Sequence, residues 1–358
     1  MGKKIYISLG IIMLLIVIAI ISGIIWYKNG QKTTGKNQET IIEIQSGTST
    51  TNILSLLQEN KVIKNDFVAK IYMSLHEVKN LKAGKYQFKG NETLQEVLQI
   101  LTSGKVMDET VNITFVEGKN MRYIASTIAE KTNNTANDVY NLLEDQNYIA
   151  SLIDKYWFLT NDIKNSDIYY PLEGYLYPDT YSFENIDVNV KTIFEKMLDK
   201  TSEILTKNKT QIQKSKYSVH QILTLASIAE LEGNNKENRA QIANVMYNRI
   251  QNNMSLGSDV TTYYAMKVDM GERDLYAKEI NTYNAYNTRG PNMEGKLPVG
   301  PIANPSEESI EAVLNPTQEK YLYFVADKNG DIYFSNTYEE HQTIKKKKKR
   351  KGLWYEYE

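Results

Sequence analysis

The chain contains no cysteine, and this absence excludes several kinds of chemistry. Without a thiol, no disulfide framework, cysteine-ligated zinc site or cysteine nucleophile is possible. Histidine is nearly as scarce: only His76, His220 and His341 occur, widely spaced, so His-rich metal sites and serine–histidine catalysis are not expected. The formal net charge of −1 lacks the basic excess of a nucleic-acid-binding domain, so no nucleic acid is expected as a partner. Asp, Glu, Asn and Tyr are plentiful, and these side chains suit carbohydrate chemistry.

A long apolar run occupies the N-terminus. Residues 5–27 carry no charge, and as a helix they would span about 34 Å, enough to cross a bilayer core of about 30 Å. A secretory signal would have a shorter apolar region and a small-residue cleavage site. Lys3 and Lys4 favour a cytoplasmic N-terminus. We therefore predict a single-pass protein of the cell membrane with a cytoplasmic stub, residues 1–4, and an extracellular remainder. A buried core helix is the alternative.

Outside this helix the periodicity predicts an α+β chain, whose 358 residues suffice for two or three modest domains. Residues 28–40 are polar and are predicted to be a linker. In residues 41–108, strand patterns alternate with amphipathic helix patterns. Small strand-plus-helix units of this kind resemble LysM-like modules, which bind polymeric N-acetylated sugars. A plain α+β spacer domain is the alternative.

The rest of the chain divides by pattern into three parts. Residues 109–165 are predicted to be a connecting α+β segment, and residues 166–343 a mixed α+β domain that carries the chemistry. Residues 344–358 form a basic tail. Within the larger domain, the patterns at 217–233 and 236–253 predict the two arms of a helical hairpin, because glycine and asparagine residues between them end the first helix.

Two carboxylates interrupt an apolar run in the first arm of this hairpin, LASIAELEG. On a helix Glu230 lies in line with Leu223, and Glu232 in line with Leu225, so each acid emerges from an apolar stripe. Buried carboxylates are costly unless they are paired or protonated, so one of them is expected to have a chemical role. Both lie near a helix C-terminus, which disfavours negative charge. Periodicity alone does not choose between them.

Eight motifs, in order, resemble one family: LEGYLYPDTY, LASIAELEG, NVMYNRI, LGSDVTTYYAM, AYNT, LPVGPIANPS, AVLNPTQEKYLYFVAD and FSNTYEEH. From Ile41 to His341 the chain is similar to the endolytic lytic transglycosylases of the YceG-like (MltG) family. The resemblance implies cleavage of the β-1,4 bond between N-acetylmuramic acid and N-acetylglucosamine in nascent peptidoglycan, leaving a 1,6-anhydro end and limiting strand length. It also implies that no metal or organic cofactor is needed, and that peptidoglycan synthases, including penicillin-binding proteins, are partners.

The resemblance further implies that one acid suffices. This acid protonates the leaving oxygen and then, as a carboxylate, removes the proton from the C6 hydroxyl, whereas hydrolases use a second carboxylate. We match it to the first Glu of the E-x-E pattern, Glu230. The acid must keep its proton near neutral pH, which an apolar surrounding favours. Glu232 is expected to support the site by pairing with Arg239 or Arg249. A structural Glu230, satisfied by a neighbouring amide or by Arg239, is the alternative.

Two further motifs are expected to contribute to a sugar-binding groove. Glu173 in LEGYLYPDTY is a candidate wall residue, with a purely structural turn as an equal alternative. Ser258 and Asp259 match the S-D pair of the family. In the same motif Gly257 replaces the usual Gln and Val260 the usual Pro, so this part of the wall is expected to differ in detail.

A third motif supplies Tyr286, Asn287 and Thr288, which match the Y-N-T of the family. Their amide and hydroxyl groups are suited to hydrogen bonds with N-acetyl groups and ring hydroxyls. Arg289 stands where another Tyr is usual, so the shape of the groove is expected to change there.

The basic run KKKKKRK, Lys345 to Lys351, is not explained by the resemblance. It is predicted either to contact anionic wall polymers or lipid headgroups, or to be a solvated disordered tail. Two rival functions remain open. One is a muramidase that hydrolyses the same bond with Asp259 or Glu173 as second carboxylate, and the other is a non-catalytic scaffold that binds the cell wall through the module and the basic run.

Overall fold

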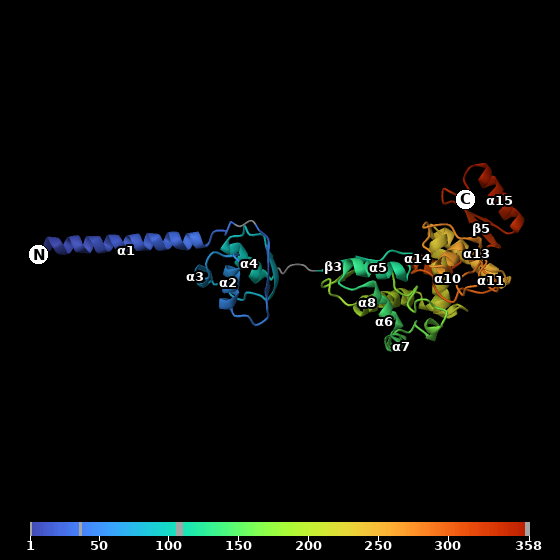
Figure 1. The fold of residues 1–358 in the computed structure, drawn as a ribbon, viewed down its shortest axis with the longest axis horizontal. Helices are drawn as coiled ribbons and strands as arrows, with labels where there is room; N and C mark the ends of the chain where they lie inside the picture. Colours follow the sequence, from blue (N-terminus) through green and yellow to red (C-terminus); the bar gives the residue numbers. More distant parts are fainter. Residues whose placement is uncertain (1, 36–37, 105–109, 355–358) are drawn as a thin grey trace. The chain divides into compact units, whose positions relative to one another are not determined.

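The computed structural model describes residues 2–35, 38–104 and 110–354, which belong to two compact units, Met1–Glu109 and Thr110–Glu358 (Figure 1). The first unit begins with helix α1 (Gly2–Gly30). Its segment Ile7–Gly30 includes an 18-residue stretch with a mean hydropathy of 2.9 that the rest of the chain does not bury. By length and composition this helix is able to cross a membrane, a property that signal sequences share. The finding is compatible with the predicted anchor.

The remainder of the first unit is a small α+β fold around one core. Strands β1 (Thr40–Ile44) and β2 (Gly84–Phe88) pair antiparallel, with Thr40 opposite Phe88. Between them lie helices α2 (Thr50–Glu59) and α3 (Asp66–Leu75), and α4 (Leu94–Ser103) follows β2. The strands alternate, so that one face of the hairpin is buried against apolar side chains of all three helices. The strands and helices predicted from the alternation at 41–108 are therefore present.

The second unit starts with a strand that pairs far along the chain. Strand β3 (Val111–Thr114) lies antiparallel to β4 (Thr180–Phe183), with Val111 opposite Phe183. The intervening and following helices are α5 (Met121–Lys131), α6 (Ala136–Glu144), α7 (Gln146–Lys155), the 3₁₀ helix η1 (Asn161–Lys164), α8 (Val190–Lys207) and α9 (Lys209–Lys214).

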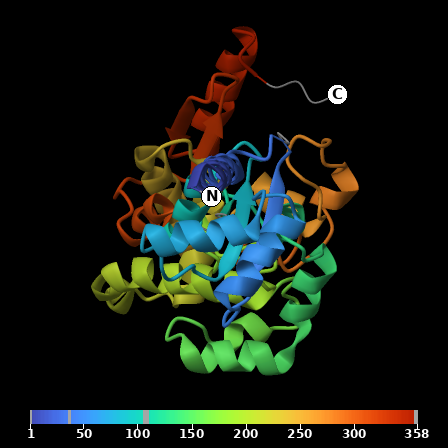
Figure 2. The same ribbon diagram turned by 90° about the vertical axis from the view of Figure 1, so that its left-hand side faces the viewer.

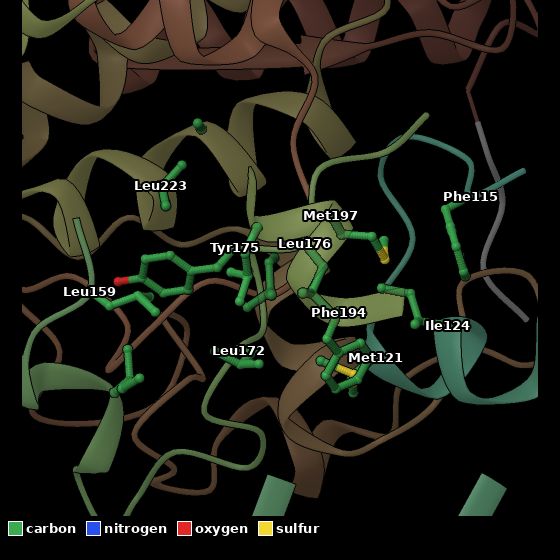
Figure 3. Packing of buried hydrophobic residues seen from close by; sticks show 14 of the residues in the cluster. Phe115, Met121, Ile124, Leu159, Leu172, Tyr175, Leu176, Phe194, Met197 and Leu223 are labelled. Carbon is green, nitrogen blue, oxygen red and sulfur yellow. The ribbon is translucent and has the colours of Figure 1, made fainter. Parts of the chain in front are cut away.

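A single core joins the segment expected to be a connector with the domain after it. Phe115 and Ile124 lie in the same cluster of buried side chains as Tyr175 and Phe194 (Figure 3). Residues 110–165 thus share one hydrophobic core with the region that carries the two acids.

The predicted helical hairpin is present as α10 (Val219–Glu232) and α11 (Lys236–Gln251). Ser218 caps α10 through a capping box with Gln221, and the helix ends at Gly233 as predicted. Every residue of α10 from Ile222 to Ala229 is buried. Short helices α12 (Asp259–Ala265) and α13 (Ala277–Ile280) follow, and α14 (Glu307–Leu314) packs against both arms of the hairpin.

The chain ends in a third small substructure. Strands β5 (Tyr323–Ala326) and β6 (Ile332–Ser335) form an antiparallel hairpin, and helix α15 (Tyr338–Arg350) packs on it. Figures 1 and 2 show these elements, in red, projecting from the helical part of their unit. Most of the basic run, expected to be a tail, lies in an ordered helix that Thr337 caps through Glu340.

Candidate active site

The carboxylate of Glu230 is enclosed by donors from two other helices. Its Oε1 accepts a hydrogen bond from Arg239 Nη2 at 2.7 Å. Its Oε2 accepts from the backbone N–H of Ser306 at 2.9 Å, and from the hydroxyls of Ser306 at 2.5 Å and Ser309 at 2.7 Å. Only 5 % of this side chain is exposed. Both oxygens therefore have protein partners, and one partner is charged.

These contacts place the Glu230 carboxylate at the N-terminus of α14, where Ser306 is the N-cap. Free N–H groups and the helix dipole attract negative charge at such a position. Arg239 comes from α11 and also pairs with Glu308 at 3.0 Å. The apolar surrounding that we expected for Glu230 is not found. The alternative, a carboxylate satisfied by Arg239, describes the observed contacts, which join α10 to α11 and α14.

Glu232, two residues later, has a different environment. Its Oε1 accepts a hydrogen bond from the Ser258 hydroxyl at 2.5 Å, and its side chain is half-buried. Burial raises the pKa of Glu232; the charge of Asp259 raises it further, while the Ser258 hydrogen bond and the charges of Arg289 and Arg249 lower it. The net effect is an acid that keeps its proton to higher pH than an ordinary Glu. Glu232 thus has the property required of a proton donor.

The predicted pairing of Glu232 with Arg239 is not present, because Arg239 contacts Glu230 instead. Arg249 hydrogen-bonds backbone oxygens of Leu256 at 2.7 Å and Leu322 at 2.6 Å. It therefore acts on Glu232 through its charge, while its guanidinium organises the loop that leads to Ser258.

Thr288 holds the Ser258 loop in place from behind. Its hydroxyl accepts a hydrogen bond from the Ser258 N–H at 3.0 Å and shares another with the Thr261 hydroxyl at 2.8 Å. Thr288 and Thr261 are fully buried. Gly257 adopts a φ of +62°, a conformation that disfavours other residues. Thr288 thus fixes the backbone that aims the Ser258 hydroxyl at Glu232.

Tyr286 and Asn287 are also fully buried. Asn287 Oδ1 accepts from the Thr262 hydroxyl at 2.6 Å, and its Nδ2 donates to the Thr282 carbonyl at 2.8 Å. The Tyr286 hydroxyl accepts from the Tyr169 N–H at 3.3 Å. The polar groups of the Y-N-T residues therefore form hydrogen bonds within the protein, and these residues shape the wall behind Ser258. Direct contact between these groups and sugar stays a prediction.

Glu173 lies inside the unit, with 1 % of its surface exposed. Its carboxyl accepts hydrogen bonds from the Met121 N–H at 2.9 Å, the Tyr264 hydroxyl at 3.0 Å and Asn304 Nδ2 at 3.3 Å. Burial raises the pKa of Glu173 to about 7, although the hydrogen bonds from Met121 and Tyr264 lower it. The residue joins the start of α5 to α12 and to the loop before α14. This arrangement matches the structural alternative.

Asp259 and Arg289 form an ion pair beside Glu232. Both side chains are about half exposed. Arg289, at the position where Tyr is usual in the family, thus holds the second half of the S-D pair. Of the predicted site residues, the structure brings Glu232, Ser258 and Asp259 together.

A cavity of about 360 Å³ lies against the last turn of α10, and its lining includes none of the predicted site residues. Leu231, which stands between the two acids in the sequence, lines it together with Gly118 and Lys119 of the β3–α5 loop and Tyr263 of α12. Gly118 lies against α10: a Cβ there would come within 3.3 Å of Leu231 and 3.4 Å of Glu230. Its neighbour Glu117 has a pKa raised by burial and by the charge of Glu230. This loop therefore forms one rim of the site.

Sequence reasoning missed Ser306, Ser309 and the loop at Glu117. A signal for Ser306 was present, because a serine followed by two glutamates is a typical helix start. No local pattern connects this helix start with Glu230.

A larger cavity, of about 580 Å³, lies between α9, α11 and the end of α14 and contains none of the predicted site residues. Within residues that the structure describes, no group of three or more His, Asp or Glu side chains is arranged to hold a metal.

The chain was compared with known families and proteins. The model of the YceG-like family matches residues 42–347. An endolytic murein transglycosylase from Bacillus subtilis (strain 168) is 37 % identical over 309 residues, which cover 86 % of this chain and 84 % of the relative. A protein of the same description from Streptococcus pneumoniae (strain D39) is 28 % identical over 84 % of this chain and 56 % of its own length.

A solved structure supports the same relationship. The crystal structure of a YceG-like protein from Listeria monocytogenes covers 87 % of this chain and 100 % of its own, with 34 % identity and a TM-score of 0.62. The similarity extends over most of both described units.

Proposed function

Because the chain belongs to the YceG-like family, we propose that it is an endolytic lytic transglycosylase of peptidoglycan. It cuts glycan strands internally, at the β-1,4 bond between N-acetylmuramic acid and N-acetylglucosamine. The observation that carries the chemistry is the carboxyl of Glu232, whose pKa is raised by burial and whose hydrogen-bond partner is the Ser258 hydroxyl.

The reaction needs one group that first gives and then takes a proton. Protonated Glu232 donates its proton to the glycosidic oxygen while the bond from that oxygen to C1 of the muramoyl residue breaks. The C6 hydroxyl of the same residue attacks C1, and the Glu232 carboxylate removes the hydroxyl proton. A C1–O6 bond replaces the glycosidic bond, no water enters, and Glu232 is protonated again. The bond-breaking step develops positive charge at C1, as in other glycosidic cleavages.

We assign this role to Glu232 rather than to Glu230 for a structural reason. Arg239, Ser306 and Ser309 are the partners of a carboxylate, and a Glu230 that delivers a proton would have to leave them. Glu232 has one hydrogen-bond partner in the described part of the chain, Ser258, so it can deliver a proton without leaving an ion pair. Glu230 then serves to hold the end of α10 in place.

The second candidate function is hydrolysis of the same bond. Asp259 favours it, because this half-exposed carboxylate lies close enough to Glu232 to raise its pKa. A hydrolase uses such a second carboxylate as nucleophile or water base. In the transglycosylase, Asp259 instead tunes Glu232 and stabilises positive charge at C1, while Arg289 keeps it in place.

The location of the enzyme is also proposed here. Helix α1 anchors the chain in the cell membrane, with its N-terminus in the cytoplasm and the residues after it outside. The order β1-α2-α3-β2 supports a LysM-like glycan-binding role for residues 41–108. An enzyme tethered in this way acts on strands as they emerge and limits their length, with peptidoglycan synthases as partners.

Digestion of purified peptidoglycan with the full chain in detergent, followed by mass analysis of the released ends, tests this function. We expect long glycan fragments whose new ends are 1,6-anhydro-muramoyl residues. Reducing muramoyl ends would establish the hydrolase, and absence of cleavage by a folded protein would overturn both.

A further inference from the structure

Helix α15 is fixed to the β5–β6 hairpin through one of its lysines. Lys348 Nζ forms an ion pair with Asp327 at 2.9 Å and lies 3.5 Å from the centre of the Tyr333 ring. His341, two turns earlier on the same face, packs against Tyr323 with ring centres 5.5 Å apart. The charge of Lys348 and the ring of His341 on this inner face therefore hold the helix on the hairpin.

The opposite face of α15 carries a separate set of cations. Its exposed members are Lys346, Lys347, Lys349, Arg350 and Lys351. At the helical period they occupy an arc of roughly 200° that leaves out Lys348. In the part of the chain that the structure describes, no carboxylate lies within 4.0 Å of any of them. We call these five residues the basic face.

The basic face is not required by the family relationship as a whole. The YceG-like match ends at residue 347, so Lys349, Arg350 and Lys351 lie beyond it. The face is also poor in apolar side chains, and none of the residues of α15 is buried. A surface of this kind attracts anions electrostatically and does not insert into hydrocarbon.

We propose that the basic face docks the second unit onto the headgroups of an anionic lipid bilayer. Lipid is favoured over a free phosphate polymer because α1, as proposed above, tethers the same chain to a membrane. Exposed cations near a charged bilayer each add to binding, and salt weakens the attraction. The contact holds the unit that carries Glu232 close to the membrane surface.

The chain offers a direct test because it has no cysteine. Thr343 is exposed on the same side of α15 as the basic face, and Thr343→Cys accepts a single fluorescent donor. The full chain is reconstituted into vesicles of zwitterionic lipid alone, or with about one third anionic lipid, each with acceptor-labelled headgroups. We expect energy transfer to rise several-fold with anionic lipid and to return to the zwitterionic level in about 1 M salt, where the Debye length is about 3 Å.

The matched variants remove five cations each. Gln at the five positions of the basic face should abolish the rise in energy transfer with anionic lipid. An equal charge change on α8 and α9 should leave that rise unchanged; it replaces Lys191, Lys200, Lys207, Lys209 and Lys214 by Gln. Circular dichroism checks that α15 remains folded. Energy transfer that is independent of lipid charge, or equal loss in both variants, would overturn the docking proposal.

Two further outcomes are distinguishable. In the first, soluble polyphosphate changes the fluorescence of the label, whereas anionic vesicles do not. This result would assign the basic face to phosphate polymers and overturn docking on lipid. Release of the chain from zwitterionic vesicles by washing would overturn the anchoring by α1, and would leave the response to lipid charge as a separate measurement.

Discussion

Arg239 of α11 and Glu230 of α10 form a salt bridge of 2.7 Å in which the side chains are 13 % and 5 % exposed. Ser306 and Ser309 complete the hydrogen bonds of this carboxylate. A buried ion pair of this kind is a structural element, because removal of one member leaves the other charge buried and uncompensated. The relationship separates two acids that are neighbours in sequence, and it is the reason for which we propose Glu232 as the proton donor.

The first prediction concerns the salt bridge between Arg239 and Glu230. Glu230→Gln should lower the free energy of unfolding by about 3 kcal/mol, the usual cost of breaking a buried ion pair. The matched control is Glu308→Gln, which removes the other partner of Arg239, a mostly exposed one, and should cost less than about 1 kcal/mol. Thermal unfolding followed by circular dichroism measures both. Equal melting temperatures for the two variants would contradict the structural role of Glu230.

The second prediction concerns the proton donor. Glu232→Gln should lower the rate of anhydro-end formation by about 10²–10⁴-fold, because an amide cannot give and retrieve a proton. Stability should be kept, since the substitution removes an acid that burial disfavours. Mass analysis of the released ends and a melting curve give the two readings.

The comparison with Glu230→Gln makes this assignment decisive. A folded Glu232→Gln enzyme with a near-normal rate would remove Glu232 from the mechanism. If Glu230→Gln were instead inactive and as stable as the parent chain, the role would pass to Glu230.

The two acids also show how far the sequence could lead. Periodicity and the glycine and asparagine residues after Glu232 predicted α10 and its end, because those signals are local. The partner of Glu230 was not predictable in this way: Ser306 lies 76 residues further along the chain and reaches Glu230 only through the packing of α14 on the hairpin. Strand β4 was missed for a similar reason, since four residues between turn-forming segments give little pattern until they pair with β3.

The same limit applies to the residues taken over from the family resemblance. The chemistry of the Y-N-T side chains suggested contact with sugar. In the structure Asn287 and Thr288 are fully buried and hydrogen-bonded to the protein. Burial is a property of the tertiary fold, so polar side chains that support a wall and those that face the substrate look alike in sequence.

The third prediction uses two neighbours of Glu232 that act in opposite directions. The Ser258 hydrogen bond lowers the pKa of Glu232, so Ser258→Ala should move the alkaline limb of the activity–pH profile to higher pH. The Asp259 charge raises this pKa, so Asp259→Asn should move the limb to lower pH. Initial rates across pH 5 to 9, roughly the range where a raised carboxyl pKa lies, measure both. Shifts of the same sign would contradict Glu232 as the titrating group.

The last prediction concerns Glu173, whose buried carboxyl has a pKa raised to about 7. An acid with a higher pKa in the folded state stabilises the fold fully below its unfolded pKa, near 4.5, and loses this contribution as pH rises through 7. The second unit should therefore lose about 3 kcal/mol between pH 4.5 and pH 8 through this group. Glu173→Gln should abolish that loss, because its amide is neutral throughout and retains an oxygen that accepts the Met121 N–H.

Urea unfolding at pH 5 and pH 8 provides the measurement, with Glu308→Gln as an exposed control. A parent chain equally stable at both pH values would contradict it, and would mean that the Tyr264 and Asn304 hydrogen bonds keep Glu173 ionised.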